Sequence, residues 1–389
     1  MSIHRVCFVG AGAMGRVNAV RTALAGYPAT LYDVDPRCLE AAPAQLEESA
    51  ELLVAGGQCS AADIPAALAR LSVEPDLARA VDGVDLVSES VYERLDIKRE
   101  VHSQLDALCA PQTIVTTNSS FLLPSEIEAG LSHGERFAAL HSYMASPLMD
   151  IVGCSRTKPS VIDTLRDYAA SLGAIPLVLN REYPGYLLNA MLGPVLATAK
   201  LLLLEGRGSC EEIDRSWMRR RQAPAGPFGI LDLIGLGLVH DSWQHREDEG
   251  PIPGLRPRVL SLLEPYVRRG DLGVRSGRGF YCYPDAPYMA PGFAAGGPQR
   301  EDLYRPLELA LLGSALAIAG SNVAEPADID LAWRIGMSLD AGPFELFAEL
   351  GRARFAARFS QHVGAGCFDP GRADVALQYL GRGSPEAPA

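Results

Sequence analysis

Two apolar segments of this sequence end in residues suited to acid–base chemistry. The segment 113–117 leads into Asn118-Ser119-Ser120, and the segment 138–141 ends in His141. A polar turn after a buried strand lies where α/β proteins bind ligands, and an imidazole exchanges protons near neutral pH. The simpler alternatives are a capping role for the turn and a satisfied core histidine.

A glycine-rich turn near the start of the chain predicts a nucleotide site. Gly10-Ala11-Gly12-Ala13-Met14-Gly15 follows the apolar run 6–9 and opens a helical pattern. Its glycines allow a tight turn, the approach of a pyrophosphate, and close packing of helix on strand. Asp33 ends the second apolar run, where its carboxylate would bind ribose hydroxyls and repel a 2′-phosphate. The predicted cofactor is NAD, and the alternative is a glycine turn that binds no nucleotide. The predicted contacts are Gly10, Gly12, Ala13, Met14, Gly15 and Asp33.

Short β-branched runs alternate with helical patterns in the first half of the chain, which indicates a doubly wound α/β sheet. The Pro184-Gly185 pair ends this alternation, and the sequence beyond it is mostly helical, starting with the segment 187–204. The sequence therefore predicts a Rossmann-type domain over 1–183 followed by an all-α domain. The predicted strands are Val6–Val9, Ala29–Tyr32, Leu86–Glu89, Thr113–Thr117, Ala138–His141 and Ile175–Leu179.

The helical half contains an internal repeat with an offset of 116 residues. Its matching members are Glu212-Ile213-Asp214 with Asp328-Ile329-Asp330, Trp217 with Trp333, Gly226-Pro227-Phe228 with Gly342-Pro343-Phe344, and Gly235 with Gly351. This many matches predict two copies of a helical module. We assign the first copy to 184–290 and the second to 299–381, and we expect 382–389 to be a disordered tail.

Composition narrows the classes of function. The formal net charge of −12 argues against a nucleic-acid partner. The eight cysteines are scattered, with no CxxC pair or Cys/His cluster, so we expect reduced thiols and no metal site. No segment predicts a signal peptide or a membrane span, and we therefore expect a cytoplasmic protein.

Several segments resemble the 3-hydroxyacyl-CoA dehydrogenase family. They are the run from Glu89 to Lys98, the Asn118-Ser119-Ser120 turn, His141 at 23 residues after Asn118, and the run from Pro184 to Asn189. The resemblance implies that Glu93, Lys98 and Asn118 contact the cofactor. It also implies that His141 is catalytic and that Ser120 and Asn189 hold the substrate oxygen. The alternatives are an exposed charge pair for Glu93 and Lys98, and a solvent-facing Asn189.

The sequence departs from the family pattern around His141. The family has a Glu twelve residues after the histidine, as its orienter and charge partner, and this sequence has Gly153 there. The family's His-Phe-Phe-Asn-Pro run reads His141-Ser142-Tyr143-Met144-Ala145. We expect Asp150 to be a poor substitute, because residues three apart on a strand point to opposite faces. Either Glu182 reaches the histidine, or the substrate occupies the space at Gly153.

The resemblance implies hydride transfer between NAD(H) and C3 of a 3-hydroxyacyl thioester, carried by CoA or an acyl carrier protein, in a homodimer. The alternative, suggested by Gly153, is an enzyme on the same scaffold that acts on another hydroxy acid or a biosynthetic intermediate. A non-catalytic NAD-binding protein is a third possibility, which the joint presence of His141, Ser120 and Asn189 disfavours. Arg219 to Arg221 are either phosphate contacts or a solvated helix face.

Overall fold

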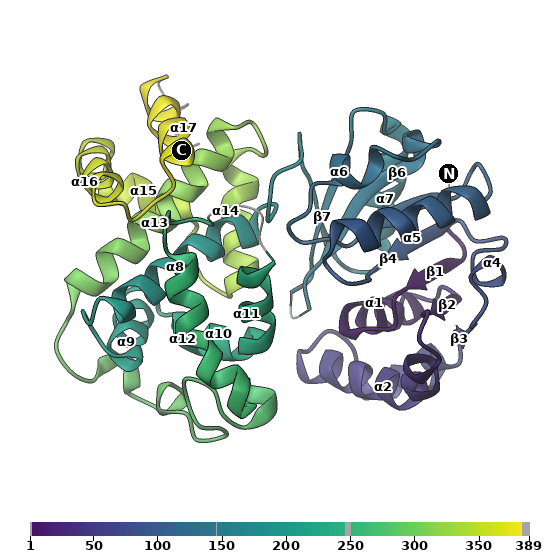
Figure 1. Cartoon of the computed structure of the whole chain (residues 1–389), viewed down its shortest axis with the longest axis horizontal. Helices are drawn as coiled ribbons and strands as arrows, with labels where there is room; N and C mark the ends of the chain where they lie inside the picture. The colour runs from purple at the N-terminus through teal and green to yellow at the C-terminus, as the bar shows by residue number, and fades with distance from the viewer. Residues whose placement is uncertain (1, 145, 246–249, 383–389) are drawn as a thin grey trace. The chain divides into compact units, whose positions relative to one another are not determined.

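The chain folds into two compact units, Met1–Tyr186 and Leu187–Ala389. The computed structural model describes residues 2–144, 146–245 and 250–382, so the predicted tail lies outside the described residues except for its first member. Figure 1 shows that the first unit carries the sheet and that the second is built from helices. The first unit contains all the predicted cofactor contacts, together with His141 and Ser120.

Unit 1 is built on one eight-stranded sheet with the order β3-β2-β1-β4-β5-β6-β7-β8. Neighbouring strands are parallel except for β6 and β7, which are antiparallel. The strand order reverses between β1 and β4, and ligands bind at the carboxyl ends of strands at such a point. The strands are β1 (Val6–Val9), β2 (Ala29–Tyr32), β3 (Leu71–Val73), β4 (Leu86–Glu89), β5 (Ile114–Thr117), β6 (Phe137–Ser142), β7 (Leu148–Gly153) and β8 (Ile175–Val178).

Helices cover both faces of this sheet. Side chains of α1, α2 and α7 pack against Phe8, Leu31 and Ile151 on one face, and those of α5 and α6 pack against Val87 and Val115 on the other. Because side chains alternate along a strand, these contacts define the face to which each strand residue points. The helices are α1 (Ala13–Leu24), α2 (Pro36–Ala55), α3 (Ile64–Leu68), α4 (Leu77–Ala80), α5 (Leu95–Leu108), α6 (Pro124–Glu128) and α7 (Pro159–Ser171).

The predicted fold class is confirmed, and the six predicted strands match β1, β2, β4, β5, β6 and β8 to within one residue at each end. Two strands are absent from the prediction. β3 is a short edge strand, and β7 carries Asp150 in the middle of an otherwise apolar run. The second omission matters, because β7 is the antiparallel neighbour of the strand that carries His141.

Unit 2 is built from helices and has no named strand among its described residues, and two of its helices recur later in the chain at a constant offset. α9 and α14 begin 116 residues apart with equal lengths, and so do α10 and α15. Asp214 caps α10 by accepting hydrogen bonds from the N–H groups of Phe228 and Gly229, and Asp330 accepts one from Phe344 at α15. The helices are α8 (Leu188–Leu204), α9 (Cys210–Arg221), α10 (Pro227–Ile234), α11 (Leu236–Gln244), α12 (Arg256–Arg269), α13 (Glu301–Gly320), α14 (Pro326–Met337), α15 (Pro343–Leu350), α16 (Arg352–Gly364) and α17 (Pro370–Gly381).

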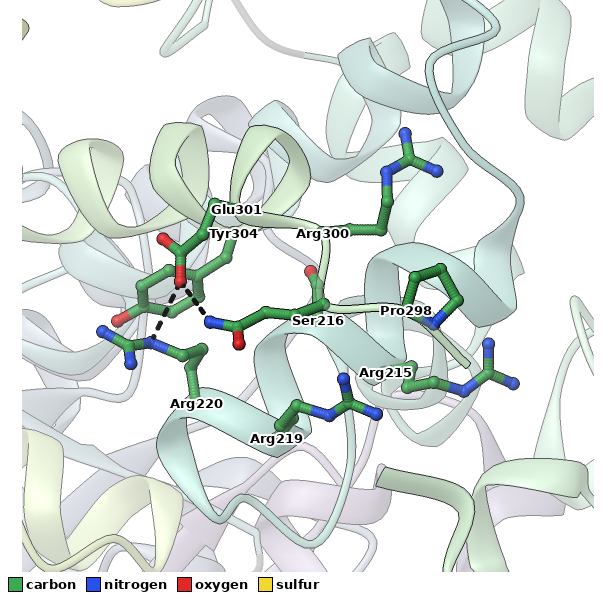
Figure 2. A pocket seen from close by; sticks show the side chains of 9 residues that line it. Arg215, Ser216, Arg219, Arg220, Pro298, Arg300, Glu301 and Tyr304 are labelled. Carbon is green, nitrogen blue, oxygen red and sulfur yellow. Dashed lines mark hydrogen bonds and ion pairs between the residues drawn. The ribbon is translucent and has the colours of Figure 1, made fainter. Parts of the chain in front are cut away.

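Arginines at the end of α9 contact the connector, the segment between α12 and α13, and the start of α13 itself (Figure 2). Arg219 donates hydrogen bonds to three connector carbonyls, those of Ala294, Gly296 and Gly297. Arg220 lies 3.7 Å from Glu301, and Arg221 donates to the hydroxyl of Tyr304 at 3.1 Å. These protein partners account for the arginine run, and a phosphate ligand is not needed to explain it.

One helix of the described residues, α13, is long and apolar enough to cross a membrane by length and composition alone. By this criterion of length and composition, the expectation that no segment predicts a membrane span is wrong. Of its apolar window, 78% is buried inside the protein, and the helix packs against α8 and α17. This burial is what the core helix of a folded domain shows.

Candidate active site

The glycine turn joins β1 to α1, and its geometry requires glycine at two positions. Gly10 has a φ of +107°, and a Cβ there would lie 2.6 Å from the carbonyl oxygen of Ser90. A Cβ at Gly15 would overlap the carbonyl oxygen of Gly10. A Cβ at Gly12 would meet no described atom within 4 Å, so this glycine leaves open the space in front of α1. That space, at the N-terminus of a helix, fits a pyrophosphate.

Asp33 directly follows β2 and is held beside the glycine turn. Its Oδ2 accepts a hydrogen bond from the N–H of Ala11 at 2.7 Å, and its Oδ1 accepts one from the N–H of Asp35 at 2.9 Å. Ala13 and Met14 form the adjacent first turn of α1. Each carboxylate oxygen keeps a further lone pair that a ribose hydroxyl can use.

Ser120, His141 and Asp150 form a hydrogen-bonded series. Nε2 of His141 lies 3.1 Å from Oγ of Ser120, and Nδ1 lies 3.1 Å from Oδ2 of Asp150. His141 is 2% exposed and Asp150 is fully buried. Because an ionised carboxylate only accepts hydrogen bonds, Asp150 selects the tautomer with its hydrogen on Nδ1. Nε2 is then available to accept a proton.

The expectation that Asp150 is a poor partner is wrong, and the strand register gives the reason. β6 and β7 are antiparallel, with His141 directly opposite Asp150 and Ala138 opposite Gly153. Directly opposed residues point to the same face of a sheet. Phe137, on the face of His141, packs on the side of α5 and α6, whereas Ala138 packs on the other side. Asp150 therefore meets the histidine, and position 153 faces away from it.

Neither Glu182 nor a substrate at Gly153 takes the place of the family's Glu. A Cβ at Gly153 would lie 2.8 Å from the Cβ of Thr157, so protein atoms fill the space in which a substrate is expected. The carboxylate of Glu182 is bound to Ser125, whose N–H donates to it at 2.9 Å and whose hydroxyl donates at 2.5 Å. Asp150 is the acidic partner of His141.

Two tyrosines enclose the imidazole of His141. The ring centroids of Tyr143 and Tyr186 lie 4.6 Å and 4.9 Å from its own. Tyr143 donates its hydroxyl hydrogen to Oδ2 of Asp150 at 2.5 Å. The hydroxyl of Tyr186 is buried without a hydrogen-bond partner in the described residues. Burial, with the charge of Asp150, raises the pKa of Tyr186 well above its usual value, so this phenol stays protonated.

Glu93 organises the turn that carries Ser120. Its Oε1 accepts hydrogen bonds from the N–H groups of Ser120 and Phe121, both at 2.9 Å, and from the hydroxyl of Ser119 at 2.6 Å. Its side chain remains 39% exposed. The structure thus gives Glu93 a positioning role for Ser120, beside the cofactor contact that the family resemblance implies.

A second buried cluster surrounds Glu89 at the end of β4. The Glu89 carboxylate accepts hydrogen bonds from Lys98 at 2.7 Å, His102 at 3.0 Å, Thr117 at 2.7 Å and the N–H of Val91 at 2.6 Å. Burial by itself raises the pKa of Glu89, but Lys98 and His102 lower it to about 2. Lys98 is 1% exposed and lies 3.4 Å from Glu93, so these two residues do not form an exposed surface pair.

The remaining predicted residues fall in different places. Asn118 links β5 to β6, since its Oδ1 accepts a hydrogen bond from the N–H of Ser142 at 2.8 Å. The hydroxyl of Ser142 also donates to Oδ1 of Asn18 at 2.8 Å. Asn189 belongs to unit 2, where it is the second residue of α8 and is partly exposed.

Sequence reasoning rejected Asp150, and it gave no role to Tyr143 or Asn18. One signal in the sequence points to the first of these. Ser146-Pro147 is a turn dipeptide between two apolar runs. A hairpin whose loop includes this dipeptide can bring His141 opposite Asp150.

A nucleotide-binding α/β unit with a histidine–carboxylate pair, followed by a helical unit, defines a two-domain NAD-dependent dehydrogenase. Residues 5–183 match the family model described as 3-hydroxyacyl-CoA dehydrogenase, NAD binding domain. Residues 185–283 match that of 3-hydroxyacyl-CoA dehydrogenase, C-terminal domain. The chain belongs to the 3-hydroxyacyl-CoA dehydrogenase family, and NAD is its cofactor.

Individual relatives agree with this membership. The chain is 31% identical over 292 residues to the mitochondrial hydroxyacyl-coenzyme A dehydrogenase of Rattus norvegicus, covering 72% of this chain and 91% of that protein. It is 29% identical over 295 residues to the 5-formyl-3-hydroxy-2-methylpyridine 4-carboxylate 5-dehydrogenase of Mesorhizobium japonicum, with the same two coverages. The structure of 3-hydroxybutyryl-CoA dehydrogenase from Escherichia coli K12 matches with a TM-score of 0.77 at 22% identity, over 98% of this chain and 100% of that chain. This last likeness is one of fold.

Proposed function

We propose that this enzyme interconverts 3-hydroxyacyl and 3-oxoacyl thioesters, with CoA as the carrier. The observation that carries the proposal is the series Ser120–His141–Asp150. It lies on the sheet that also carries the glycine turn, among strands that end at the same edge. An acyl carrier protein would present the same thioester and is the second source to be tested.

In the proposed mechanism His141 is the general base for oxidation. Its Nε2 takes the proton of the C3 hydroxyl, and it returns that proton to the oxygen during reduction. Asp150 stabilises the imidazolium that forms, because its Oδ2 accepts the hydrogen bond from Nδ1. Ser120 donates a hydrogen bond to the substrate oxygen as its charge changes. The same role is proposed for Asn189 on the family resemblance alone. Bound NAD supplies the acceptor for the hydride that leaves C3.

For the cofactor, we propose that Gly10, Gly12, Ala13, Met14 and Gly15 contact the pyrophosphate and that Asp33 binds the ribose. The open space in front of Gly12 supports this assignment. Glu93, Lys98 and Asn118 are proposed for the nicotinamide side, with Lys98 acting through Glu93. The negative charge of Asp33 favours NAD over NADP. Roughly 1.4 kcal/mol of repulsion between Asp33 and the 2′-phosphate is enough for a tenfold difference in Kd.

A second candidate is a related dehydrogenase whose substrate is not an acyl thioester. The relative from Mesorhizobium japonicum is named for a pyridine carboxylate, which supports this candidate. The residues at positions 142–144 also differ from the family run beside His141. Gly153 does not support it, because Asp150 supplies the carboxylate.

The deciding experiment follows NADH absorbance with purified full-length protein. Its substrates are acetoacetyl-CoA, an acetoacetyl carrier protein and free acetoacetate, with NADPH as a parallel arm. We expect the fastest turnover with acetoacetyl-CoA and NADH. Turnover of the free acid alone would favour the second candidate, and the absence of turnover with all three would contradict the thioester proposal.

We propose further that unit 2 is a duplicated module whose second copy packs on the first. The equal helix lengths and repeated aspartate caps support this, and so do the indole rings of the equivalent residues Trp217 and Trp333, which lie 6.3 Å apart.

Leu233 and Leu238 of the first copy are 58% and 65% exposed. They support a homodimer through this unit, for which sedimentation of wild type and Leu238→Arg is the test. The free thiols of all eight cysteines agree with the proposed cytoplasmic location.

A further inference from the structure

Arg21, in the last turn of α1, is a buried charged residue. Its side chain is 8% exposed. It donates hydrogen bonds to the carbonyl oxygens of Tyr143 and Met144, both at 2.9 Å, and of Ser146 at 3.3 Å. It also donates to Oε1 of Gln58 at 3.0 Å. Its guanidinium has no carboxylate partner in the part of the chain that the structure describes.

A buried guanidinium without a carboxylate is expensive to keep, since it loses hydration and gains no opposite charge. Burial lowers the pKa of Arg21 to about 10, which still leaves it charged at neutral pH. The backbone carbonyl dipoles of Tyr143, Met144 and Ser146 provide its compensation. This segment is therefore held where the guanidinium can reach it.

The segment that Arg21 holds follows the catalytic histidine directly. Tyr143, whose carbonyl accepts from Arg21, donates its own hydroxyl hydrogen to Asp150. One turn earlier on α1, Asn18 accepts a hydrogen bond from Ser142. Positions 142–144, which depart from the family run, are thus each bonded to α1, and position 143 is bonded to β7 as well.

The same helix begins at the glycine turn. We propose that Arg21 is a positioning residue that couples the nucleotide-binding helix to the loop holding the His141–Asp150 pair. The catalytic consequence rests on the function proposed above, but the coupling itself does not. When the dinucleotide restrains the start of α1, Arg21 carries this restraint to residues 142–148. The loop then becomes ordered together with the cofactor.

Amide hydrogen exchange with and without NADH tests this coupling without any substrate. In the wild-type protein we expect NADH to slow exchange in two places, the glycine turn at 10–16 and the segment 142–148. In Arg21→Met the protection of 10–16 should remain, while that of 142–148 is lost. Arg21→Lys keeps the charge but cannot reach three carbonyls at once, so it should show intermediate protection.

Arg136 provides a control that is likewise buried but is paired with a carboxylate, that of Asp106 at 3.3 Å. It is 4% exposed and also donates to backbone carbonyls, those of Cys109, Ala110 and Asp106, at the amino end of β6. Arg136→Met should destabilise the fold yet keep NADH protection of 142–148. We also expect kcat to fall at least about tenfold in Arg21→Met, with the Kd for NADH nearly unchanged, because small misplacements of a catalytic group have effects of this size.

Two results would overturn the proposal. One is that Arg21→Met binds NADH and still protects 142–148, which would mean that the cofactor reaches the loop by another route. The other is that wild-type protein shows no protection there. Neither depends on which substrate the enzyme uses, so failure of the proposed function and failure of the coupling are separate outcomes.

Discussion

Two buried histidine–carboxylate pairs lie on the same face of the sheet, and their differences show which one is built for chemistry. Nε2 of His102 is 3.0 Å from Glu89, and Nδ1 of His141 is 3.1 Å from Asp150. All four residues are 2% exposed or less. Each pair joins an imidazole to a buried carboxylate, and the two nitrogen–oxygen distances are nearly equal.

Their surroundings differ. Glu89 accepts four hydrogen bonds and has the ammonium of Lys98 as a counter-charge, so its carboxylate is saturated. Nδ1 of His102 is buried and meets no polar partner among the described residues. Oδ1 of Asp150 has no partner among the described residues, and Nε2 of His141 meets the hydroxyl of Ser120. A carboxylate that already carries a buried counter-charge stabilises the fold, whereas a histidine whose second nitrogen meets a serine hydroxyl can exchange a proton with a substrate hydroxyl.

The largest effect should separate the two histidines. His141→Gln removes the acid–base group, and we expect kcat to fall by about 10²- to 10⁴-fold. NADH affinity, measured by fluorescence titration, should stay close to wild type. His102→Gln should lower Tm and leave kcat nearly unchanged. Equal losses of kcat in the two variants would abolish the distinction.

Asp150→Asn should have the next largest effect. An amide cannot stabilise the imidazolium, and the same change in the serine-protease triad costs about 10⁴-fold. We expect part of this, a loss of about 10²-fold in kcat, with little change in the KM for NADH. Tyr143→Phe is the control, because it removes one hydrogen bond to Asp150 and keeps the pair. Wild-type kcat in Asp150→Asn would show that the carboxylate is not the partner.

Glu89→Gln should act on stability, with a loss of about 3 kcal/mol, because it leaves Lys98 buried without its counter-charge. The folded-state pKa of Glu89 is lowered from 4.5 to about 2. Its contribution is therefore present above pH 4.5 and is lost as the pH falls towards 2. Urea unfolding at several pH values measures this. The exposed Glu100→Gln on α5 is the control, and identical curves for the two variants would contradict the prediction.

The smallest effect concerns the position of the family's Glu. Gly153→Ala should cost about 1–3 kcal/mol, because its Cβ would press on Thr157. Gly153→Glu should be less stable still and no faster with acetoacetyl-CoA. Gly130→Ala, whose Cβ would meet no described atom within 4 Å, is the neutral control. A tenfold faster Gly153→Glu enzyme would return the catalytic role to position 153.

Much of unit 1 could be predicted from the sequence, because the sequence patterns that mark its elements are local. The glycine turn, the apolar runs that form six strands and the polar turn after β5 each reflect the chemistry of neighbouring residues. β7 was missed because Asp150 interrupts its apolar run. The helical repeat could be recognised because its Asp and Gly-Pro-Phe members recur at a constant offset.

The sequence by itself determined that this chain carries a glycine-rich turn typical of NAD binding and a histidine at the end of a strand. It also determined that a serine lies in the turn after the neighbouring strand. Only the tertiary structure decided which carboxylate serves that histidine. The choice between Asp150, Gly153 and Glu182 depends on an antiparallel register and on which face each side chain takes. Likewise, Arg21 is 120 residues from His141 in the sequence, and it reaches the catalytic loop only because the segment that follows β6 meets α1 in the folded chain. Pairings between distant segments follow from how elements pack, and local composition does not encode them.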